Sequence, residues 1–180
     1  FSGPRRPLCL AELFRAGGFA VDDSDLCNGA QYDLADDTVW MPIRERLLAG
    51  FYSACFASLP CSTFSRLRSI PDGPGPLRGL SGRDRYGLKH LSITNAELVR
   101  LHNLLATRSA EALAISLRTK GVAILEQPAL RDEEVSMLST DGVQHNVGVQ
   151  CAFGSHCAKL SSWLSVGCTL GDMPSACIHS

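Results

Sequence analysis

The segment from Phe56 to Ser65 places a cysteine where it could act as a nucleophile. A hydrophobic run over residues 52–57 stops at Pro60, and Cys61 follows at once, before a group of small hydroxyl residues. In open α/β sheets, the carboxyl edge of the strands is where ligands and chemistry collect. A thiolate held at such an edge is a strong nucleophile. Cys61 is therefore the leading candidate for a catalytic residue, and a buried structural thiol is the alternative.

Three further segments are predicted to bring polar groups to the same edge. They are the Phe1-Ser2-Gly3 turn, the acids from Asp22 to Asp25, and Glu126-Gln127-Pro128 after the apolar run 122–125. A glycine in a first turn and an acid after a second strand are what a nucleoside-bearing cofactor requires, because the carboxylate accepts the ribose hydroxyls. The structural alternatives are a turn cap for Asp25 and an ion pair for Glu126.

These motifs together resemble the DNA (cytosine-5) methyltransferases, in particular a compact branch without a large target-recognition domain. Ser58-Leu59-Pro60-Cys61 is similar to the family's catalytic Pro-Cys motif, and Glu126-Gln127-Pro128 to its Glu-Asn motif. The resemblance implies DNA as partner, S-adenosylmethionine as cofactor, and Cys61 and Glu126 as catalytic residues. The implied cofactor contacts are Phe1, Ser2, Gly3, Asp25 (with Asp22 and Asp23 as rivals), Asp33, Ser58 and Pro60. The implied substrate contacts are Ser62, Ser65, Arg66, Arg68, Gln127 and Lys159.

The chemistry of this family explains why such residues belong together. A thiolate that adds to carbon 6 of cytosine turns the ring into an enamine, and carbon 5 can then attack a sulfonium methyl group. A carboxyl group that holds and protonates N3 stabilises the addition, which is the role expected for Glu126. The target base must leave the double helix to meet both groups.

The sequence departs from the family pattern at three places. Leu59 stands where a proline usually precedes the Pro-Cys pair, Gln127 replaces an asparagine, and Lys159 is the one basic residue of the late strand. The missing proline should loosen the Cys61 turn. Two alternatives therefore stay open: an inactive module that binds DNA or cofactor without turnover, and methylation of RNA or a small molecule.

Charge is unevenly distributed although the net charge is only −1. Acids dominate residues 19–45, whereas residues 66–90 are basic and carry Arg66, Arg68, Arg78, Arg83, Arg85 and Lys89. Residues 66–93 also lack any periodic pattern, and a loop of this length in a compact domain is usually functional. We expect it to attract a polyanion to the Cys61 edge, with an ordinary solvated loop as the alternative.

The elements that must position these residues follow from hydrophobic periodicity and helix caps. Helices are predicted over 8–16, 41–49 and from Thr94 to Gly121, the last with Thr94 as cap and an apolar face of Leu98, Leu101, Leu105, Ala112, Leu113 and Leu117. Strands are predicted over 19–21, 52–57, 122–125, 147–150 and 163–166. This alternation predicts one α/β domain over 1–180: a Rossmann-like, mostly parallel sheet with helices on both faces and a closing hairpin. The strand before Phe1 is expected to be missing from this chain.

Eight cysteines and the absence of a charged-then-apolar leader indicate reduced thiols in an intracellular protein, nuclear in a eukaryote or cytoplasmic in a prokaryote. No apolar run is long enough for a membrane span. A zinc site is the weaker idea for the metal-capable residues of the last third, because they lack a Cys-x-x-Cys pair. Those residues are Cys151, His156, Cys157, Cys168, Cys177 and His179. We expect no metal.

Overall fold

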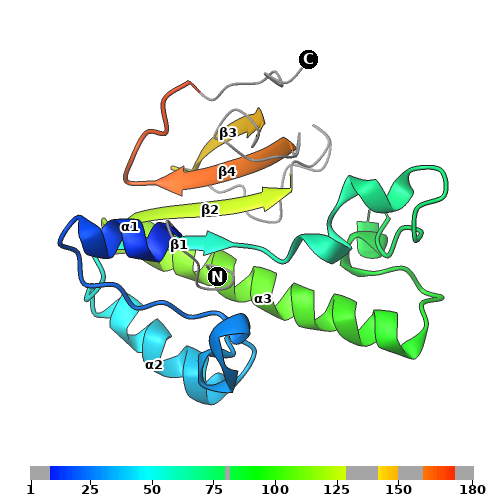
Figure 1. Ribbon diagram of the computed structural model, residues 1–180, viewed down its shortest axis with the longest axis horizontal. Helices are drawn as coiled ribbons and strands as arrows, with labels where there is room; N and C mark the ends of the chain where they lie inside the picture. The colour runs from blue at the N-terminus through cyan, green and yellow to red at the C-terminus, as the bar shows by residue number, and fades with distance from the viewer. Residues whose placement is uncertain (1–8, 80–81, 129–141, 150–159, 173–180) are drawn as a thin grey trace.

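A four-stranded sheet of mixed direction is the centre of the protein. The computed structural model describes residues 9–79, 82–128, 142–149 and 160–172. The strands are β1 (Ala54–Ser58), β2 (Val122–Pro128), β3 (Gln144–Val149) and β4 (Leu160–Val166), in the order β1-β2-β4-β3. β1 and β2 are parallel, whereas β4 is antiparallel to both β2 and β3 (Figure 1).

The long helix α3 (Ile93–Arg118) connects the two parallel strands and packs on one face of the sheet. Ala106 and Leu113 of this helix pack with alternate residues of three strands, namely Ala57, Leu59, Ala123, Leu125, Leu164 and Val166. Because side chains alternate along a strand, the residues between these point to the opposite face. The opposite face carries Ser58, Glu126, Ser161 and Trp163.

The buried face of α3 differs from the one predicted. It runs through Val99, His102, Ala106, Ser109, Leu113 and Ser116, so that only Ala112 and Leu113 of the predicted set are fully buried. The predicted cap was also wrong, because Ser92 is the N-cap and its hydroxyl accepts the N–H of Asn95 at 3.3 Å. Hydrophobic periodicity missed this face because three of its buried positions are polar residues that have hydrogen-bond partners.

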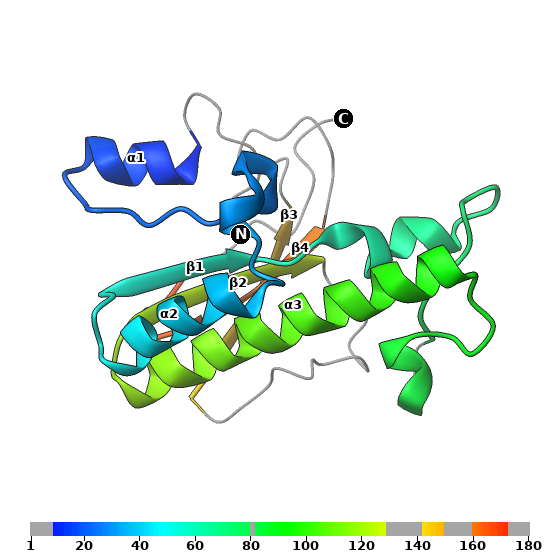
Figure 2. The ribbon, with the colours of Figure 1, turned by 90° about the horizontal axis from the view of Figure 1, so that it is seen from below.

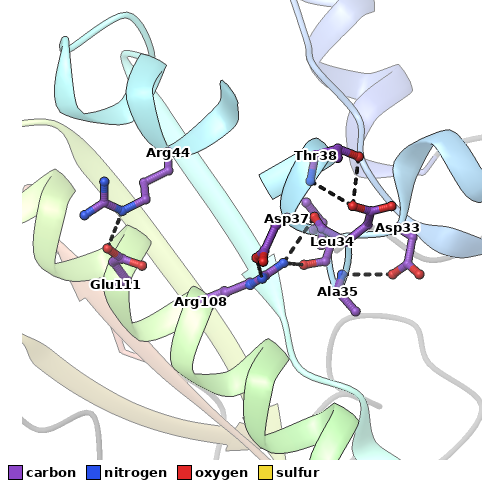
Figure 3. Close-up of polar contacts among 9 residues, drawn as sticks. Asp33, Leu34, Ala35, Asp37, Thr38, Arg44, Arg108 and Glu111 are labelled. Atoms are coloured by element: carbon purple, nitrogen blue, oxygen red, sulfur yellow. Dashed lines mark hydrogen bonds and ion pairs between the residues drawn. The ribbon is translucent and has the colours of Figure 1, made fainter. Parts of the chain in front are cut away.

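A second, smaller core lies between α3 and α2 (Asp37–Leu48). α2 begins four residues before the predicted start because the Asp36 carboxylate accepts the N–H of Thr38 at 2.8 Å and caps the helix. Pro42 therefore lies in the helix interior rather than in its first turn. Figure 3 shows how Arg108 of α3 reaches the start of α2, where it donates to the carbonyl of Leu34 and to the carboxylate of Asp37.

The described part of the segment before α2, residues 9–36, contains an α-helix but no strand. α1 (Leu10–Ala16) ends near the predicted Gly17-Gly18 pair, and Gly18 adopts a left-handed φ of +86°. The predicted strand 19–21 was wrong: these residues have no strand partner, and Phe19 is 63% exposed. α1 lies on the side of the sheet opposite α3 (Figure 2).

The fold is thus mixed α/β with an open and only partly parallel sheet. The mostly parallel, Rossmann-like arrangement is not confirmed, because one of the three strand pairings is parallel and two are antiparallel. The closing antiparallel pair was predicted correctly, since β3 and β4 pair across residues 144–149 and 160–166. β3 runs in the same direction as β2 and is separated from it by the antiparallel strand β4.

Candidate functional site

The Cys61 turn lies directly beyond β1, as expected. Pro60 precedes a 3-10 turn over Cys61–Thr63, and the Cys61 carbonyl closes it by accepting the N–H groups of Phe64 at 3.0 Å and Ser65 at 2.8 Å. The Cys61 thiol is half-buried and donates to the Leu59 carbonyl, with 3.7 Å between Sγ and the oxygen. The turn therefore holds a reduced thiol at the carboxyl end of the strand.

Glu126 is brought to the same end of the sheet by the pairing of β1 with β2. Its backbone lies opposite Ser58 in the parallel register. The Ser58 hydroxyl donates to Glu126 Oε2 at 2.5 Å, and the Ser161 hydroxyl of β4 donates to Oε1 at 2.6 Å. Glu126 is only 5% exposed. Residues of three strands thus hold one buried carboxylate. Its register partner in β1, Ser58, is three residues before Cys61.

Leu59 fixes the start of the turn through a backbone N–H, which a proline lacks, and through a buried side chain. Its backbone N–H donates to the Glu126 carbonyl at 3.0 Å, which extends the β1–β2 ladder beyond Ser58. Its side chain is 3% exposed and belongs to the sheet–α3 core. These contacts indicate that the turn is held firmly without the proline, contrary to the expectation that its loss loosens the turn.

Replacing Leu59 by proline, the family residue, should destabilise this chain. The substitution removes the N–H that the Glu126 carbonyl accepts and should cost about 1–3 kcal/mol. Urea unfolding measures the change. Leu59→Met is the matched control, because it keeps the N–H and most of the volume. Equal or greater stability of Leu59→Pro would show that this hydrogen bond contributes nothing.

The predicted substrate contacts do not all lie near Cys61 and Glu126. Gln127 is buried and, one residue after Glu126, lies on the α3 face of the sheet. Ser62 is exposed, and Ser65 closes the turn through its N–H. Arg68 donates to the Gly75 carbonyl at 2.8 Å and so braces its own loop. The Arg66 side chain and Lys159 lie outside the described part of the chain.

The acids predicted to hold a cofactor serve as caps or partners in the segment before β1. Asp25 accepts the N–H of Cys27 at 2.9 Å, which is its structural alternative, and Asp33 accepts the N–H of Ala35 at 2.9 Å (Figure 3). The rival Asp22 accepts the Tyr52 hydroxyl at 2.7 Å, at the amino end of β1. Asp23, the other rival of Asp25, is buried.

Of the four strand ends expected to share one crevice, two come together. These are the ends of β1 and β2, with Ser58, Pro60, Cys61 and Glu126. Phe1, Ser2 and Gly3 lie outside the described residues. Residues 19–21, directly before the acids from Asp22 to Asp25, do not form a strand. The described acids thus lie on loops and turns, not at the end of a second strand, which is where the resemblance places them.

Comparison with known proteins adds no relative. No family model, curated protein or solved structure matches the chain.

Within the described ranges, no three metal-capable side chains gather in one place, and no helix combines the length and apolar character of a membrane span. Of the proposed zinc residues, Cys168 is described and is a free thiol. The other five lie in the parts of the chain that are not described.

Sequence reasoning missed the polar groups that support the site from behind. Ser161 is one of several serines in β4, and nothing in its sequence context distinguishes it. Beneath the Cys61 turn, Thr63 contacts Arg78 and His102. Arg78 was grouped with the basic loop, whose Arg83 and Lys89 are indeed exposed, but Arg78 itself is turned inward.

Proposed function

We propose that this chain is the catalytic domain of a DNA cytosine-5 methyltransferase, with Cys61 as nucleophile and Glu126 as the group that binds the pyrimidine ring. The observation that carries the proposal is the pairing of Ser58 with Glu126. It brings the half-buried thiol after β1 and a serine-held carboxylate in β2 to one end of the sheet. Burying a carboxylate is costly, and its position beside the thiol supports a role in function.

The residues of this site have complementary tasks in the proposed reaction. The Cys61 thiolate adds to carbon 6 of a flipped cytosine, which makes carbon 5 nucleophilic. The Glu126 carboxyl group donates a proton to N3 and accepts a hydrogen bond from the exocyclic amine, and the N3 proton neutralises the negative charge that the addition places on the ring. After methylation, water takes the proton from carbon 5, the Sγ–C6 bond breaks to free Cys61 as a thiolate, and the N3 proton returns to Glu126.

S-adenosylmethionine is proposed as the methyl donor on the sequence resemblance alone. Bound to the protein, it would supply an electrophilic methyl group. The described acids do not fit a nucleoside crevice, so we derive no contact between them and the cofactor.

Methyl transfer from labelled S-adenosylmethionine to DNA tests the proposal. We expect label in cytosine of duplex DNA and a covalent adduct between Cys61 and DNA that contains a trapping cytosine analogue. Transfer to RNA or to free nucleosides in place of DNA would redirect the proposal to that substrate. A folded protein that forms no adduct and transfers no label would refute it.

Glu126→Gln should nearly abolish activity while the fold survives. The amide keeps the size of the side chain, and the serine hydroxyls can still pair with it, because one of them can accept from the new NH2 group. Loss of the carboxyl group should lower kcat/KM by roughly 10²–10⁴-fold. Glu111→Gln, which changes a half-exposed partner of Arg44, is the control and should leave kcat/KM unchanged. Equal kcat/KM in Glu126→Gln and the wild type would exclude Glu126 from the chemistry.

A binding module without turnover is the second candidate, and the cofactor acids favour it. Asp25 and Asp33 accept backbone N–H groups as turn caps. Calorimetry separates the two candidates: binding of DNA by a protein that neither binds S-adenosylmethionine nor forms an adduct would support the module.

A further inference from the structure

Arg78 lies beneath the Cys61 turn and joins three segments that are distant in sequence. Its Nε and Nη2 donate to the Thr63 hydroxyl at 3.3 and 3.0 Å. Its Nη1 donates to Asn103 Oδ1 at 2.6 Å and to the Arg85 carbonyl at 2.9 Å. The guanidinium carbon lies 3.9 Å from the centre of the Phe64 ring. One side chain thus fixes the turn after β1, the basic loop and α3 to each other.

The environment of Arg78 is unusual for a residue of a basic loop. Burial lowers its pKa to about 10, which still leaves the side chain charged at neutral pH. The oxygens that accept its hydrogen bonds belong to a hydroxyl, an amide and a carbonyl, which are all neutral. A desolvated cation held in this way does not serve as a phosphate contact, since its donors are directed inward.

The hydrogen bonds of Thr63 determine the state of His102. Arg78 can only donate, so the Thr63 hydroxyl accepts from it and has one proton left. That proton is directed to His102 Nδ1, 2.9 Å away. His102 must then be neutral and carry its own proton on Nε2. Burial and the charge of Arg78 both lower the pKa of His102, which agrees with this state.

We infer that Arg78 is a positioning residue that clamps the Cys61 turn through the Thr63 hydroxyl, with neutral His102 as the last acceptor. Thr63 and Phe64 follow Cys61 by two and three residues, and the Cys61 carbonyl binds the N–H of Phe64. The Phe64 ring also contacts the guanidinium and lies nearly parallel to the His102 ring, with 6.4 Å between the two ring centres. Movement of this clamp would therefore move the thiol.

The tautomer of His102 tests the clamp in the unmodified protein. In ¹⁵N-histidine-labelled protein at neutral pH, we expect a His102 signal of the neutral Nε2–H form, assigned by its loss in His102→Gln. Thr63→Val should abolish this preference and give a mixture of tautomers. A protonated or Nδ1–H histidine in the wild type would overturn the inference.

The reactivity of Cys61 tests the effect on the turn. Alkylation is followed by mass spectrometry at Cys61 and at the exposed Cys27 of the same molecule. Arg78→Lys and Thr63→Val should raise the Cys61-to-Cys27 rate ratio by about five- to tenfold, the effect of losing one hydrogen bond. Arg44→Lys makes the same exchange at a half-exposed pair and should leave the ratio unchanged.

An unchanged or lower ratio in both variants would overturn the clamp. The positioning role rests on the proposed function only for its effect on catalysis, and neither measurement requires methyl transfer. A wild-type protein without methyl transfer, but with the expected tautomer and alkylation ratios, would refute the proposed function and leave the clamp intact.

Discussion

Replacing Cys61 by serine should eliminate both methyl transfer and covalent trapping of DNA. Serine fits the half-buried turn and can donate to the Leu59 carbonyl as the thiol does. Its hydroxyl, however, is a far weaker nucleophile than a thiolate. Loss of the nucleophile should lower kcat by roughly four orders of magnitude or more. Transfer of labelled methyl groups to DNA and denaturing gels of the trapped adduct measure the two effects.

A matched variant separates loss of chemistry from loss of fold. Cys27→Ser removes an exposed thiol in the segment before α2 and should leave both activities at the wild-type level. Urea unfolding should place Cys61→Ser close to the wild type, because the serine hydroxyl can make the hydrogen bond to the Leu59 carbonyl that the thiol makes. Full activity in Cys61→Ser would exclude covalent catalysis through this residue, whatever the protein's substrate.

The sequence is most informative where an apolar run and a turn signal agree. The strands that hold the candidate site were predicted within a few residues: 52–57 became Ala54–Ser58, and 122–125 became Val122–Pro128. Both runs are short, apolar and bounded by proline or glycine. Their parallel pairing, with a helix between, then brings Cys61 and Glu126 to the same edge.

Direction and partners were harder to predict, because they depend on contacts between distant residues. The run 19–21 is apolar enough for a strand, yet Phe19 packs edge-on against Phe14 of α1 rather than in the sheet. The direction of β4 is set by its neighbours β2 and β3 and leaves no local pattern. Buried polar residues such as His102 were invisible for the same reason: their partners, Thr63 among them, are far away in sequence.

Arg108 makes the clearest of these long-range contacts. Replacing it by methionine should lower the free energy of unfolding by about 3–4 kcal/mol, because several charge-assisted hydrogen bonds are lost together. Its side chain is 7% exposed and donates to the Leu34 carbonyl, to the Asp36 carbonyl at 3.3 Å and to the Asp37 carboxylate (Figure 3). Methionine keeps the apolar stem but leaves the buried Leu34 carbonyl without this donor.

The comparison with Arg44→Met decides whether burial causes the loss of stability expected in Arg108→Met. Arg44 pairs with Glu111 across the same two helices at 2.6 Å, but both side chains are 33% exposed. Water can replace such a pair, so its loss should change the unfolding free energy by less than about 1 kcal/mol. Because Asp37 is 80% exposed and rehydrates easily, a large loss in Arg108→Met would come mainly from the two carbonyls. Equal losses in both variants would show instead that the charge pairs, not the buried carbonyls, hold α2 against α3.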